Sequence, residues 1–119
     1  VTDGLVLALD AADNNSYSGS GATWYDLSRN GNNGTLTNGP TFSSAGGGCI
    51  DFDGTNDYIA LPSTSIFNLN NQAFTVNLWF KIDNFTAEWD PFFTKGDDCW
   101  RIQRWSGCGW YLPVGGWDH

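Results

Sequence analysis

Oxygen-bearing side chains gather in two short loops of this sequence, and these residues are the ones best suited to hold a cation. They are Asp26, Asn30 and Asn32 in the first loop and Asp53, Asn56 and Asp57 in the second. Ca²⁺ takes about six to eight oxygen ligands from carboxylates, amides and loop carbonyls, so both sets are candidate calcium sites. Asx turns, in which Asp and Asn bond their own main chain, need only the same residue types and are the simpler interpretation.

Aromatic and basic side chains supply the candidate ligand-binding residues. A Trp ring offers a flat apolar face with a polar edge, while Arg can pair with an anionic sugar. The residues proposed for this role are Trp79, Trp100, Arg101, Arg104 and Trp105. The alternative is that most Trp rings pack in the interior and that the two Arg side chains are solvated beside Asp97 and Asp98.

The carboxylates do not form the pair that glycoside hydrolysis requires, which is an acid and a second carboxylate across the scissile bond. Glu88 is the only Glu and lies in a predicted loop with Asp90 beside it. The one His is His119, and no Ser-His-Asp or Cys-His arrangement can be assembled around it. We therefore expect a protein that is not an enzyme.

The charge balance argues against two classes of partner. Thirteen acidic residues against five basic ones give a formal net charge of −8, which repels nucleic-acid phosphates and anionic membrane surfaces. No apolar run is long enough to span a bilayer, so membrane insertion is not expected either. A low lysine content and Asn-x-Ser/Thr triplets at Asn14, Asn33 and Asn84 favour an extracellular setting.

Three cysteines, Cys49, Cys99 and Cys108, allow at most one internal disulfide. Strict pairing across a two-residue turn at 106–107 places Cys108 opposite Trp105, so a Cys99–Cys108 bridge needs a bulge or a wider loop. Cys49 is the alternative partner, and the sequence leaves this pairing open.

The elements that position these residues are predicted to be strands. Apolar residues make up 40% of the chain, aromatic residues 16% and charged residues only 15%, and 15 Gly indicate many turns, which is typical of an all-β domain. Residues 62–72 are predicted to be an irregular connection or a single helical turn. Strands are predicted at 4–10, 35–37, 41–42, 50–52, 58–61, 73–82, 91–95, 99–105 and 108–113.

Two of these predictions carry most weight. Residues 53–56 (Asp-Gly-Thr-Asn) have turn chemistry, so 50–61 is predicted to form a β-hairpin. Residues 73–82 place apolar side chains at five successive positions of one face and Trp79 on the other, which predicts a central strand of a sandwich.

Six segments occur together in an order that is similar to a known family. They are residues 3–11, 24–28, 30–36, 52–59, 74–80 and 95–104. The sequence resembles a laminin-G-like domain of the concanavalin A-like lectin/glucanase superfamily. The resemblance implies an antiparallel jelly-roll β-sandwich and, in many members, Ca²⁺ at the loop rims, although no metal motif can be matched residue by residue. We expect 1–119 to be a single such domain, incomplete in this chain and part of a larger protein.

The leading functional hypothesis is a non-catalytic recognition or adhesion module of an extracellular, cell-surface or virion-surface protein. Its ligand would be a glycan or a protein, with Ca²⁺ as the candidate cofactor. One alternative is a structural assembly module of a fibre, capsid or surface layer, in which another chain completes the sandwich along an open edge. Another is an accessory domain of a secreted glycoside hydrolase.

Overall fold

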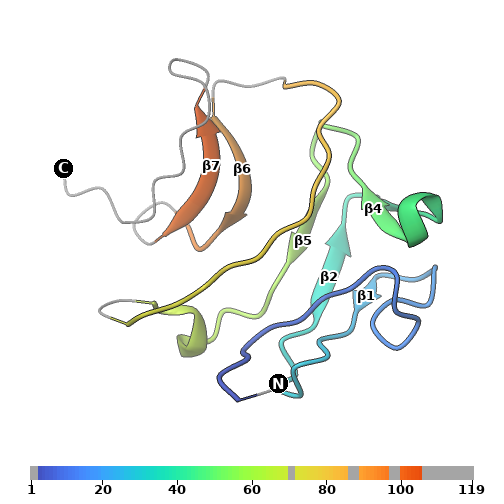
Figure 1. Cartoon of the computed structure of the whole chain (residues 1–119). Coiled ribbons are helices and arrows are strands. Elements are labelled where there is room, and N and C mark those ends of the chain that lie inside the picture. Colours follow the sequence, from blue (N-terminus) through green and yellow to red (C-terminus); the bar gives the residue numbers. More distant parts are fainter. Residues whose placement is uncertain (1–2, 70–71, 86–88, 97–99, 106–119) are drawn as a thin grey trace. The chain divides into compact units, whose positions relative to one another are not determined.

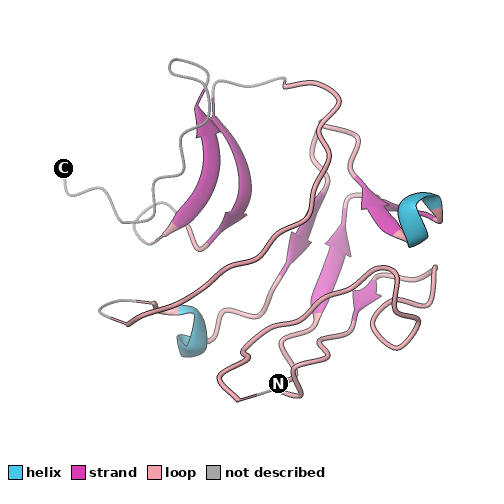
Figure 2. Ribbon diagram, in the orientation of Figure 1, coloured by secondary structure: helices cyan, strands magenta, loops and turns pink. Residues whose placement is uncertain are grey.

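The computed structural model describes residues 3–69, 72–85, 89–96 and 100–105 of the chain. The chain divides into two compact units, Val1–Ser63 and Thr64–His119. Every paired strand in the described residues is antiparallel, and the only helices there are two short 3₁₀ turns (Figures 1 and 2). None of these is a helix that could cross a bilayer. The predicted all-β class is confirmed.

The first unit contains a three-stranded sheet. Its central strand is β2 (Gly34–Thr37), flanked by β1 (Thr23–Trp24) and β5 (Tyr58–Ala60). Side chains alternate along β2, so Leu36 lies on the same face as its cross-strand partner Ile59. The predicted strands at 35–37 and 58–61 are therefore present.

The second sheet of this unit shows that the predicted hairpin was wrong. Strand β4 (Cys49–Asp51) pairs with β3 (Thr41–Ser43) across the 3₁₀ turn η1 (Ala45–Gly47), whereas β5 pairs with β2. The strands β4 and β5 thus belong to different sheets. The turn at 53–56 does form, and the Thr55 N–H donates to Asp53 Oδ1 at 2.8 Å. The turn itself was predicted correctly, but the residues of a turn do not decide which strands pair.

A small aromatic cluster forms the interior of the first unit. Tyr17 is only 3% exposed, and its ring lies 6.4 Å from that of Trp24 and 5.7 Å from that of Phe42. Ser16 beside it is fully buried, and its hydroxyl donates to the Tyr25 carbonyl and accepts from the Asp10 N–H. The loop that contains Ser16 is therefore part of the packed interior.

The predicted strand at 4–10 is absent from the described residues. Instead, the Ala8 N–H donates to Asp26 Oδ1 at 3.0 Å and the Ala8 carbonyl accepts from the Leu27 N–H at 2.9 Å. The segment is apolar and extended as its sequence requires, but its backbone bonds a loop rather than a strand.

The second unit contains the hairpin of β6 (Trp89–Thr94) and β7 (Arg101–Trp105), which confirms the two strands predicted in that region. The pairing is irregular between Pro91 and Phe93, because proline has no N–H to donate to the ladder. The connection before it holds the single 3₁₀ turn η2 (Ser65–Phe67), as predicted.

Trp100 forms the centre of the second unit. It is 7% exposed, and its indole N–H donates to the Phe67 carbonyl at 2.7 Å. The ring of Phe93 meets it edge-on at 4.9 Å, and that of Phe74 lies 6.3 Å away. A buried Trp usually finds a partner for its N–H, and here a carbonyl of η2 provides it.

The strand predicted at 73–82 does not form. The described residues 72–85 run as an extended segment with no strand assignment, drawn in Figure 2 as loop. The alternation of side chains is present, but a strand also needs a neighbour for its backbone hydrogen bonds. The predicted strand at 108–113 lies outside the described residues.

Candidate functional site

The most exposed aromatic side chain in the described residues is Trp79, at 93% exposure. The apolar positions on either side of it are turned the other way: Phe80 stacks on Phe92 with 4.6 Å between ring centroids, and Phe74 lies against Trp100. The indole of Trp79 therefore lies in solvent, while Phe74 and Phe80 contact rings of the second unit and stay partly exposed. Such a ring keeps apolar area in contact with water.

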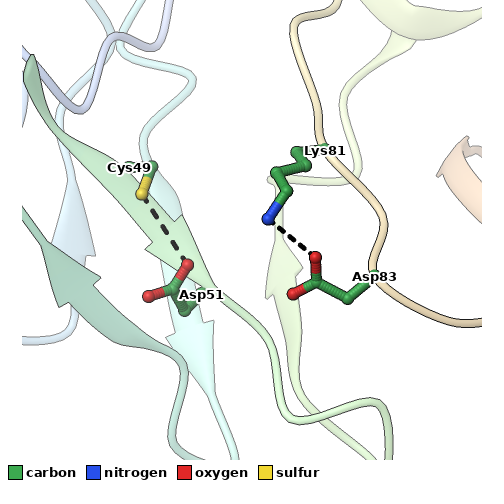
Figure 3. A network of polar contacts seen from close by, with 4 residues as sticks. All are labelled: Cys49, Asp51, Lys81 and Asp83. Atoms are coloured by element: carbon green, nitrogen blue, oxygen red, sulfur yellow. Dashed lines mark hydrogen bonds and ion pairs between the residues drawn. The ribbon is translucent and has the colours of Figure 1, made fainter. Parts of the chain in front are cut away.

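Polar side chains share the outer face with Trp79. Thr75 and Asn77 are exposed and lie on that face by strand alternation. Lys81 follows on the same face, and its Nζ lies 2.7 Å from Asp83 Oδ1 in an exposed ion pair (Figure 3). We call these five residues the Trp79 surface. It combines one flat ring with amide, hydroxyl, ammonium and carboxylate groups.

The other proposed ligand-binding residues do not join this surface. Trp100 is buried as described above and is therefore a packing residue. Arg101 lies in β7 opposite Thr94 and is partly exposed. The side chain of Trp105 lies outside the described part of the structure.

Arg104 is engaged within its own hairpin. Its Nη1 lies 3.6 Å from Asp90 Oδ2 on the neighbouring strand, and its guanidinium sits 3.8 Å above the ring of Phe85. That carboxylate oxygen is buried without a hydrogen bond in the described region, so the Arg104 charge compensates it. Sequence reasoning missed this pair because Asp90 lies just before the strand predicted at 91–95, whereas in the structure Asp90 is in β6 opposite Arg104.

Asp26 organises the first candidate calcium loop through hydrogen bonds. Its carboxylate accepts the backbone N–H groups of Ala8, Ser28 and Asn32 at 2.9–3.0 Å and the Ser28 hydroxyl at 2.7 Å. Burial tends to raise the pKa of Asp26, but these bonds, led by the Ser28 hydroxyl, outweigh it, so the pKa lies below its ordinary 3.8.

The two amides of that loop have structural partners as well. Asn30 Nδ2 donates to the Leu5 carbonyl at 2.9 Å, and Asn32, which is 3% exposed, donates to the Val6 carbonyl at 2.8 Å. Both carboxylate oxygens of Asp26 already accept hydrogen bonds. The three residues are therefore explained more simply as a hydrogen-bond network that holds the loop than as ligands of a cation.

The second candidate calcium loop is a tight acidic turn. Asp57 Oδ2 accepts the Asp53 N–H at 3.1 Å, and the Asn56 carbonyl accepts from Asn38 Nδ2 at 2.8 Å. Asp57 Oδ1 is buried and has no hydrogen-bond partner among the described residues. One open carboxylate oxygen falls short of a calcium shell, and no cluster of three or more acidic, His or Cys side chains able to hold a metal occurs in the described ranges. Calcium binding at this turn stays a prediction.

The remaining reactive groups give no catalytic arrangement that can be described. Cys49 is a free thiol on β4 that donates to Asp51 Oδ1 at 3.7 Å (Figure 3). The predicted disulfide alternatives involve Cys99 and Cys108, which lie outside the described residues. The same is true of Glu88, Asp97, Asp98 and His119.

A family model described as the concanavalin A-like lectin/glucanases superfamily, of laminin-G type, matches residues 53–118. The match covers more than half of the 119 residues, and the chain belongs to this superfamily. Its fold is a jelly-roll β-sandwich, with which the antiparallel sheets agree. Domains of laminin-G type are typically non-catalytic binding modules. No curated protein and no solved structure was found to match.

Proposed function

We propose that this protein is a non-catalytic carbohydrate-recognition module and that Trp79 is the platform on which a sugar ring stacks. The observation that carries the proposal is the 93% exposure of Trp79 on a segment whose Phe74 and Phe80 rings contact Trp100 and Phe92. Membership of a lectin-like superfamily supports a binding role. An extracellular, cell-surface or virion-surface setting suits such a module.

The chemistry of the Trp79 surface matches a glycan. The C–H face of a pyranose covers the indole ring and removes apolar area from water, at about 25 cal/mol per Å². The Asn77 amide offers both a donor and an acceptor to sugar hydroxyls, and the Lys81–Asp83 pair offers one charge of each sign. A protein ligand is the alternative, because exposed Trp residues also anchor protein interfaces.

The test is glycan-array screening of the protein followed by calorimetry with the best ligand. We expect Trp79→Ala to weaken binding by about 30-fold, which corresponds to the loss of about 2 kcal/mol from a central aromatic contact. Tyr25→Ala is the matched control, because Tyr25 is a 52% exposed aromatic residue in the other unit. An array on which no glycan binds, or equal binding by the Trp79→Ala variant, contradicts the proposal.

A further inference from the structure

The two charges of the Trp79 surface neutralise each other. Lys81 Nζ lies 2.7 Å from Asp83 Oδ1, and both side chains are exposed to solvent (Figure 3). The other members of the surface are Thr75, Asn77 and Trp79 itself, and all three are uncharged. The surface therefore presents hydroxyl, amide and ring groups beside one closed ion pair, and its net charge is zero.

A glycan with sulfate or carboxylate groups would have to compete for the ammonium group of Lys81. If an anionic group of the ligand takes that ammonium group, the carboxylate of Asp83 loses its partner and stands beside a like charge. Like charges brought together across an interface cost binding free energy. An uncharged sugar meets no such conflict, because one hydroxyl can donate to Asp83 and another can accept from Lys81 while the ion pair stays together.

The other basic side chains of the second unit have partners of their own. Lys95 Nζ donates to the Thr64 carbonyl at 2.8 Å. Arg104 is paired with Asp90 as described above, and Arg101 is likewise engaged in an interaction. All the Lys and Arg residues of this unit lie in the described ranges. The unit therefore offers an anionic ligand no basic side chain that is free of a partner.

The net charge of the chain acts in the same direction. The second unit has six acidic and four basic residues, a net charge of −2, and the first has seven acidic residues and one basic residue, a net charge of −6. Both units are therefore negative, and an anionic ligand is repelled whichever unit it approaches. At an ionic strength of about 0.1 M this repulsion acts over about 10 Å.

We propose that the ligand of the Trp79 surface is a neutral glycan, without sulfate, carboxylate or phosphate groups, and that the Lys81–Asp83 ion pair excludes anionic glycans. This inference rests on the proposed function and adds the chemical class of the sugar. The indole ring covers the C–H face of a sugar, which neutral and anionic glycans share, so Trp79 alone does not distinguish them. The charges beside the ring make the distinction.

A glycan array that displays each core oligosaccharide in neutral, sulfated and sialylated form tests the proposal. We expect the neutral form of every bound core to bind best, and its charged forms to bind at least about fivefold more weakly at an ionic strength of about 0.1 M. This difference should narrow at about 1 M, because the Debye length falls from about 10 Å to about 3 Å. Tighter binding of a charged form than of its neutral form overturns the proposal.

The Trp79→Ala variant on the same array separates this inference from the proposed function. If charged forms bind best and lose their affinity in the Trp79→Ala variant, sugar recognition at Trp79 stands and only the neutral class is wrong. If no glycan binds, or if the variant binds equally well, the proposed function fails and this inference fails with it.

Two substitutions test the role of the ion pair. Asp83→Asn removes the partner of Lys81, so the affinity for a charged form relative to its neutral form should rise by about fivefold. Asp3→Asn is the matched control, because it removes the same charge from an exposed residue outside the Trp79 surface, and it should change this ratio by less than about twofold. The same ratio in the Asp83→Asn variant and the wild type would show that the ion pair does not exclude anionic glycans.

Discussion

At the scale of the residue, the Asp26 carboxylate holds two segments of the N-terminal part of the chain together by hydrogen bonds. It joins the segment around Ala8 to the loop at Ser28 and Asn32 through four accepted hydrogen bonds. Hydrogen bonds to a charged acceptor are stronger than neutral ones, and removing the acceptor leaves several donors without a partner.

Replacing Asp26 with Ala should lower the free energy of unfolding by about 2–4 kcal/mol, because the orphaned N–H groups are partly buried. Urea denaturation at neutral pH measures this loss. Asp83→Asn is the control, because the Asp83 side chain is 78% exposed and its removal should have little effect. Equal stability of the Asp26→Ala variant and the wild type would show that these hydrogen bonds do not contribute to the free energy of unfolding.

The pH dependence of stability has a defined sign at the same residue. The pKa of Asp26 is lowered in the folded protein, so its contribution is fully present above the unfolded value of 3.8 and is lost as pH falls through the lower folded value. Below that range the wild type and an Asp26→Asn variant should converge in stability. Melting temperatures measured from pH 6 downward test this, and a constant difference between the two proteins contradicts it.

The acidic turn at Asp53 and Asp57 gives a separate prediction about metal. Because a main-chain N–H donates to one oxygen of each carboxylate and holds the turn without a metal, we expect the melting temperature to be the same in Ca²⁺ and in EDTA. Differential scanning fluorimetry measures the shift. A Ca²⁺-dependent rise that disappears in an Asp53→Asn, Asp57→Asn variant would instead identify the turn as a calcium site.

At the scale of the element, close contact between strands β2 and β5 requires glycine at Gly34. A Cβ atom there would lie 2.7 Å from Ile59 Cγ2. Gly34→Ala should therefore lower the free energy of unfolding by about 1–3 kcal/mol through overpacking. In an Ile59→Ala background the clash is gone, so the same substitution should cost less there. A double-mutant cycle in urea measures this coupling, and strict additivity would place the strain elsewhere.

The strands themselves show how far local sequence can predict this protein. Alternation and turn residues located β2, β3, β4, β5, β6 and β7, and the 3₁₀ turn η2 as an irregular connection. The same signals were wrong about the partners of β4 and β5 and about residues 73–82, because pairing joins residues distant in the sequence. Local pattern specifies which side of a strand is apolar, and only a neighbour supplies its hydrogen bonds.

At the scale of the whole molecule, composition and motif order were enough to determine the class. Many Gly, Trp and Phe residues with few charges favoured an all-β chain, and six ordered segments indicated the superfamily that the family model matches. The acidic loops were likewise identified from residue types alone. These features are local or additive along the chain, so sequence determines them.

The tertiary structure decided which of those residues are available to a ligand. Trp79 and Trp100 could not be distinguished by type, yet one is 93% exposed and the other 7% exposed. The carboxylate of Asp26 accepts hydrogen bonds from Ala8 as well as from its own loop, which the sequence did not indicate, and its role as a metal ligand stays a prediction. Exposure and hydrogen bonding depend on contacts between distant segments, and for that physical reason only the folded chain determines them.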